Sequence, residues 1–162
     1  ADFSVKYYDI EIFGREVERW TQPLFKSNGP STFALISKVI NGVRMYLVKI
    51  EHDVGTFDFF ELGPTIHWKS FHSQNNADEV ESLFRNKLNE GKSIQLDVIL
   101  SEEGGRFYHE QNRNIILSVN EDDLVRVPLP YLWVNYMTLN TLIMTSSCVN
   151  IQLRNLISLI DL

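Results

Sequence analysis

The chain has 162 residues, of which 44% are apolar and 22% charged, and its formal net charge at pH 7 is -6. This length and composition predict one globular domain over residues 1–162 and exclude a disordered chain. The acidic balance argues against a nucleic-acid partner, because binding to a phosphate backbone needs a basic surface.

Cysteine and histidine usage limits the metal chemistry that we expect. Cys148 is the only cysteine, so neither a disulfide nor a thiolate metal site is predicted within one chain. The four histidines, His52, His67, His72 and His109, lack the spacing of a zinc site, and no metal is predicted. The sequence contains no secretory leader and no apolar run of membrane-spanning length, so we expect a cytoplasmic protein without a membrane partner.

The first predicted element is a helix between Asp9 and Trp20. Apolar residues recur there at helical spacing, with Asp9 placed as an N-cap, although Gly14 weakens helix formation. The apolar positions are Ile10, Phe13, Val17 and Trp20.

The next segment predicts a β-hairpin. Residues 32–40 and 43–50 are rich in strand-forming residues and flank Asn41-Gly42, a pair that favours a type I′ turn. Shorter runs at 57–62 and 65–68, separated by a Gly-Pro pair, predict two strands that meet at a corner.

The central part of the chain predicts a helix and two strands. Residues 76–90 have apolar positions at helical spacing and precede Gly91, which suits a helix C-terminus. Residues 94–100 alternate as a half-buried strand does, and 114–119 indicate a second strand. A hairpin-like pair therefore flanks the segment 101–112.

The C-terminal part begins after a break at Pro128 and Pro130. A short apolar run, 133–136, precedes two predicted helices, 138–145 and 151–160, and Asn150 could cap the second. Taken together, the elements predict a twisted sheet covered by helices, which belongs to the α+β class.

The segment from Ser101 to Glu110, SEEGGRFYHE, gathers titratable groups around two glycines. The glycines would let the backbone approach a ligand, and Arg106 could bind a diphosphate with two hydrogen bonds. Glu102 or Glu103 could transfer a proton. The alternative interpretation is a solvated acidic turn with a glycine tip.

Two further segments contain candidate site residues. Glu61, Thr65 and His67 surround the Gly-Pro corner, and His67 could act as an acid or base near neutral pH. A lone strand histidine is, however, more often a structural hydrogen-bonding residue.

The predicted C-terminal helix has polar residues near its start, and a helix N-terminus beside an arginine can bind an anion. The alternative is an amphipathic helix whose arginine reaches solvent. These polar residues are Asn150, Gln152 and Arg154.

Six ordered blocks, which span nearly the whole chain, resemble the NDP-hexose 2,3-dehydratases. The blocks are Trp20 to Phe25 (WTQPLF), Gly42 to Lys49, Glu51 to Thr65, Ser101 to Tyr108 with Asn112, Tyr131 to Trp133, and Val149 to Leu156. The resemblance implies a Nudix-like fold, a mixed β-sheet flanked by helices, without the metal-binding Nudix box. Relative to the family pattern, His67 replaces a glutamine, Asn114 an aromatic residue and Asn155 a small hydroxyl or similar residue.

The resemblance also implies a function in deoxysugar biosynthesis. The expected reaction is dehydration of an NDP-4-keto-6-deoxyhexose: a base removes the C3 proton and the C2 hydroxyl leaves as water. The expected partner is a nucleotide sugar, with dTDP as the nucleotide, and no cofactor is required. Because the family's enzymes carry two such repeats, a single repeat implies a homodimer. The alternatives are a non-catalytic nucleotide-sugar-binding module and a purely structural or interaction domain.

Each chemical requirement of this implied reaction has candidate residues. Glu102 or Glu103 would transfer the proton, and Tyr108 or His67 would donate to the keto oxygen or the leaving hydroxyl. The expected substrate-binding residues are Arg106 and Arg154 for the diphosphate, Gln22, Asn150 and Gln152 for the sugar or base, Trp20 or Trp68 for stacking on the nucleobase, and Thr65.

Overall fold

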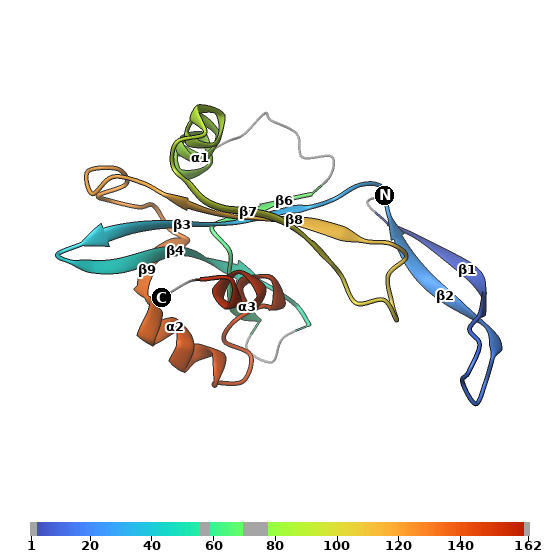
Figure 1. Ribbon diagram of the computed structural model, residues 1–162. Coiled ribbons are helices and arrows are strands. Elements are labelled where there is room, and N and C mark those ends of the chain that lie inside the picture. The colour runs from blue at the N-terminus through green and yellow to red at the C-terminus, as the bar shows by residue number, and fades with distance from the viewer. Residues whose placement is uncertain (1–2, 56–58, 70–77, 161–162) are drawn as a thin grey trace.

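The computed structural model describes residues 3–55, 59–69 and 78–160, and a mixed sheet forms its centre (Figure 1). The strand order is β5-β4-β3-β8-β7, with β6 paired to β3 and β9 paired to β4. Strands β3 and β8 are parallel, whereas the other pairs are antiparallel. The strands are β3 (Thr32–Ile40), β4 (Val43–His52), β5 (Phe60–Gly63), β6 (Ile66–Trp68), β7 (Ile94–Ser101), β8 (Gln111–Ser118) and β9 (Tyr131–Asn135).

The predicted hairpin over 32–50 is confirmed. Ile40 pairs with Val43, and the two turn residues between them have positive φ angles, 50° at Asn41 and 78° at Gly42. A type I′ turn needs this backbone conformation at both central positions, and Asn-Gly is the pair that adopts it most readily.

Helices cover both faces of the sheet, as expected for the α+β class (Figure 1). Helix α1 (Glu79–Glu90) lies on one face, and α2 (Tyr136–Ile143) and α3 (Ile151–Ser158) lie on the other. Alternate residues of β3 serve the two cores: Phe33 packs with the α3 side, and Ala34 packs with the α1 side. No helix within the described ranges is long and apolar enough to cross a bilayer.

The helix predicted between Asp9 and Trp20 is wrong. Strands β1 (Phe3–Glu11) and β2 (Arg19–Ser27) form a separate two-stranded hairpin there, which we call the arm. Asp9 does not cap a helix but accepts two hydrogen bonds from Arg19 across the strands, at 3.2 and 2.6 Å. Phe13 and Val17, which suggested a buried helical stripe, lie exposed in the connecting loop. Gly14, with φ 83°, lies in the same loop.

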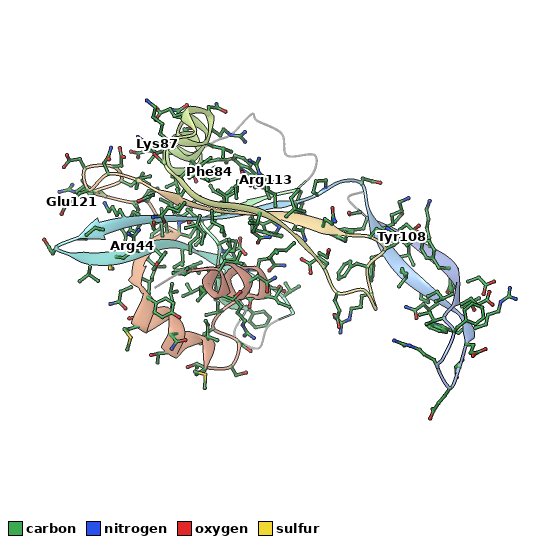
Figure 2. The ribbon with its side chains drawn as sticks, viewed as in Figure 1. Arg44, Phe84, Lys87, Tyr108, Arg113 and Glu121 are labelled. Carbon is green, nitrogen blue, oxygen red and sulfur yellow. The ribbon has the colours of Figure 1, made fainter. Side chains whose placement is uncertain are left out.

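The arm extends from one end of the body and contacts the connection between β7 and β8, residues 102–110, which we call the acidic bend (Figure 1). Phe25 donates its backbone N–H to Arg106 and accepts one from Tyr108, both at 2.8 Å. The Tyr8 and Tyr108 rings stack at 4.2 Å. Figure 2 shows Tyr108 at this junction. The arm thus fixes the backbone of the acidic bend.

Candidate functional site

Two neighbouring hollows share His67 and Gln152 in their linings, and we call the two together the groove. The first, of about 490 Å³, contains Glu51. The second, of about 380 Å³, contains Glu102. Both volumes fall in the range of about 300–1,000 Å³ that is typical of small-molecule sites. The groove connects two clusters of carboxyl groups that are distant in sequence.

In the first hollow, Glu51 is held by the start of α3. The Asn150 side-chain amide donates to Glu51 Oε2 at 2.9 Å, and its oxygen accepts the N–H of Leu153 at 2.8 Å as the helix N-cap. A Cβ at position 63 would collide with the Glu51 carboxyl, so the observed position of this carboxyl requires Gly63. Burial raises the pKa of Glu51, and Lys49 and Asn150 oppose that shift.

His67 lies in the middle of the groove, where both hollows meet. Its ring packs against Phe33 at 4.8 Å, and Nδ1 lies 4.0 Å from Glu51 Oε1, beyond hydrogen-bonding distance. Burial, together with the charges of Lys69 and Lys49, lowers the pKa of His67. The environment therefore favours the neutral forms of both His67 and Glu51, and this contact is not a strong ion pair.

In the second hollow, Glu102 and Glu110 lie at the two ends of the acidic bend. The backbone N–H of Glu102 donates to the Glu110 carbonyl at 3.0 Å, which closes the bend. Asn112 donates to Glu102 Oε1 at 2.6 Å and accepts the N–H of Ser31 at 3.1 Å. Glu110 is only 7% exposed, and burial followed by the charge of Glu102 raises its pKa.

The remaining charged residues of the acidic bend are more open. Glu103 and Arg106 border the second hollow, but their side chains are 70% and 74% exposed and form a 3.7 Å ion pair. Tyr108 and His109 border a third hollow on the arm side, which shares Glu102, Phe107 and Glu110 with the second hollow. The structure therefore brings Glu102, Arg106 and His67 to the two hollows of the groove, and it places Tyr108 in the adjoining hollow on the other side of Glu102 and Glu110.

Two predicted substrate-binding residues have roles in the fold instead. The buried Thr65 hydroxyl donates to the Leu47 carbonyl and accepts the N–H of Ile36. Trp68 follows His67 in β6 and so points to the opposite face, where its ring packs edge-on against Phe84 at 5.1 Å. These contacts hold the side chains of Thr65 and Trp68 away from the groove.

The other predicted substrate-binding residues are dispersed around the groove. Arg154 is on the exposed side of α3, where Nε donates to the Val149 carbonyl at 2.9 Å. Arg154 is not among the described residues that line the two hollows of the groove. Trp20 and Gln22 belong to the arm, and Gln22 donates to the Gly105 carbonyl at 3.0 Å, so its visible role is to hold the acidic bend.

Glu51 and Glu110 were not singled out from the sequence. Glu110, Asn112 and Asn114 are buried polar residues at every second position, on the strand face that continues to the core residue Ile116. Polar residues at buried strand positions indicate either a hydrogen-bond network or a site. That pattern was a usable signal for Glu110, whereas the pairing of Glu51 with Asn150 joins residues 99 positions apart.

Within the described part of the chain, no group of three or more histidine, cysteine, aspartate or glutamate side chains is arranged to hold a metal ion.

Comparison with known proteins identifies relatives over nearly the whole length of the chain. The family model described as NDP-hexose 2,3-dehydratase matches residues 1–160. The dTDP-4-dehydro-6-deoxy-alpha-D-glucopyranose 2,3-dehydratases of Streptomyces violaceoruber and Saccharopolyspora spinosa are 33% and 32% identical, each over 96% of this chain. The matches cover 35% and 32% of those proteins, so the chain spans about a third of the length of the curated relatives it matches.

A crystal structure of an ADP compounds hydrolase has a similar fold, with a TM-score of 0.58. The match covers 96% of this chain and 83% of the hydrolase, at 17% sequence identity. This similarity concerns the fold alone and agrees with the Nudix-like arrangement of a mixed sheet between helices.

Proposed function

Since the chain belongs to the NDP-hexose 2,3-dehydratase family, we propose that its groove binds a dTDP-linked 4-keto-6-deoxyhexose and takes part in its 2,3-dehydration. The observation that carries this proposal is the position of His67 and Gln152 in both hollows. A neutral imidazole thereby stands between two clusters of carboxyl groups, in a groove large enough for a sugar and the adjoining phosphates.

The reaction needs a base at C3 and a stabilising group at the C4 oxygen. We assign the base to Glu102, which borders the second hollow and is held by Asn112. Removal of the C3 proton places negative charge on the C4 oxygen, and expulsion of the C2 hydroxyl then leaves a C2=C3 double bond. The neutral ring of His67 would donate a hydrogen bond to the C4 oxygen and stabilise the enolate.

Cations at the second hollow suit the diphosphate. Arg106 and Lys69 both border it. A guanidinium binds phosphate oxygens with two hydrogen bonds, and an ammonium adds a point charge. Arg106 pairs with Glu103 in an exposed setting, where an ion pair contributes little and is easily exchanged for phosphate.

We also propose a homodimer in which the arm forms part of the interface. Its side chains Phe3, Val5, Tyr7 and Phe25 are exposed, and exposed apolar groups that lie together mark interaction surfaces. Light scattering should give the mass of two chains, and a monomer at every concentration would refute this part of the proposal.

The direct test is incubation of the protein with the dTDP-linked 4-keto-6-deoxyglucose, with loss of one water followed by mass spectrometry. Glu102→Gln should lower turnover by about 10²- to 10⁴-fold, the range for removal of a general base. The variant should still be stabilised by dTDP in a thermal-shift experiment. At a dTDP concentration of 100 times the dissociation constant, binding raises the free energy of unfolding by about 2.7 kcal/mol.

Arg106→Ala should weaken that thermal shift. Binding without turnover in the unmodified chain would instead support the non-catalytic binding module. Neither binding nor turnover would refute both functions.

A further inference from the structure

Glu110 is a second carboxyl group of the groove, buried beside Glu102. It borders the second hollow together with Glu102, yet it is only 7% exposed. Its Oε2 atom is buried and has no hydrogen-bond partner among the residues that the structure describes. An ionised carboxylate in this position would lose its hydration without compensation, whereas a protonated carboxyl avoids most of that penalty.

The charged groups around Glu110 favour the same protonation state. Among these groups, Glu102 acts on Glu110, because its negative charge opposes a second negative charge there. The other charged or titratable groups of this hollow are Glu103, Arg106, His67 and Lys69, and those on the arm side are Tyr108 and His109.

Arg106 does not offset this effect, because it is mostly exposed and pairs with Glu103. Glu102 has the amide of Asn112 as a donor at 2.6 Å, which stabilises a carboxylate. The two carboxyl groups are thus placed in different environments.

We propose that Glu110 is the catalytic acid of the dehydration and shares a single proton with Glu102. The assignment rests on the proposed function. Glu102 takes the C3 proton as the electron pair of the C3–H bond moves toward C4. Glu110 gives its proton to the C2 hydroxyl, the C2–O bond breaks, and water leaves as the C2=C3 double bond forms.

Proton balance supports the pairing of these two residues. The pair gains one proton from C3 and loses one to the departing water, so its charge of one negative unit is the same before and after the reaction. A proton shift from Glu102 to Glu110 then restores the starting state without exchange with solvent. Pairs of carboxyl groups whose environments separate their protonation states commonly divide the acid and base roles in this way.

Glu110→Gln tests the role in catalysis, because glutamine preserves the size and neutrality of the protonated side chain but has no acidic proton. We expect kcat to fall by about 10²- to 10⁴-fold with unchanged dTDP binding. The loss of rate that deprotonation of Glu110 causes at high pH in the unmodified protein should also disappear from the residual activity.

The matched control is Glu121→Gln, an exposed glutamate at the opposite end of the molecule (Figure 2), which should leave both properties unchanged. Turnover of Glu110→Gln within a factor of three of the unmodified chain would overturn the assignment.

The protonation state can be measured separately, without substrate, by ¹³C NMR of glutamate side-chain carboxyls. Glu110, identified by the signal missing in Glu110→Gln, should titrate above the usual glutamate pKa of about 4.3. Its midpoint should fall when Glu102→Gln removes the neighbouring charge.

A usual glutamate pKa for Glu110 that does not change in Glu102→Gln would refute the proposal that the two residues share a proton. If the unmodified chain turned over no nucleotide sugar while Glu110 titrated as expected, the proposed function would fail and the pair alone would stand.

Discussion

Glu51 and Glu110 are carboxyl groups at opposite ends of one groove, and they differ in their partners. Glu51 accepts a hydrogen bond from Asn150, whose oxygen caps α3, so a helix start and a strand hold it in place. Glu110 has a buried oxygen without a partner among the described residues and lies on a bend whose tip is exposed. The hydrogen bond from Asn150 holds the carboxyl of Glu51 in place, whereas the oxygen of Glu110, unpartnered within the described part of the chain, suits the proton-donating role proposed for it.

His67 lies between the two ends, and its substitution should have a larger effect than substitution of Asn150, which holds Glu51. His67→Phe keeps the packing on Phe33 but removes the hydrogen-bond donor proposed for the C4 oxygen. The loss of one such donor lowers kcat by about 10²- to 10³-fold. His67→Gln retains an N–H donor and should lose less. The measurement is kcat of the two variants by steady-state kinetics. An equal loss of kcat in both would show that the reaction does not require hydrogen-bond donation by His67.

Asn150→Ala should have a smaller effect. It tests the end of the groove at Glu51 separately from the end at Glu110. The variant removes the α3 cap and the donor to Glu51 together. The missing cap should lower the free energy of unfolding by about 0.5–2 kcal/mol, and the released Glu51 should also reduce turnover.

Asn135→Ala is the matched control for this effect. Asn135 caps α2 through Thr138 at 2.8 Å and borders neither hollow of the groove. Thermal unfolding should show similar losses of stability in both variants, with reduced turnover in Asn150→Ala alone. Equal turnover in both would mean that the position of Glu51 does not matter for catalysis.

The fold was predictable wherever a local pattern coincided with burial. Asn41-Gly42 predicts the β3–β4 turn, and Gly91, with φ 70°, ends α1 as expected. The sequence of the arm has a helix-like pattern because its loop residues Phe13 and Val17 have helical spacing by coincidence, although both are exposed. Periodicity predicts a helix only when the apolar positions face a core.

The site was predictable only in part, for a related reason. The acidic bend and His67 are visible as sequence features, and the structure places Glu102, Arg106 and His67 along one groove. Trp68 neighbours His67 in sequence but faces the other side of the sheet, which strand alternation alone would indicate. The Glu51–Asn150 contact depends on how β4 meets α3, and no local pattern encodes such a long-range pairing.

A crystal structure of the chain with dTDP tests most directly whether the groove is the nucleotide-sugar site. The account predicts density along the groove, with the phosphates toward Arg106 and the ligand in contact with Gln152 and His67. Nucleotide bound on the α1 face beside Trp68, with the groove unchanged, would contradict it.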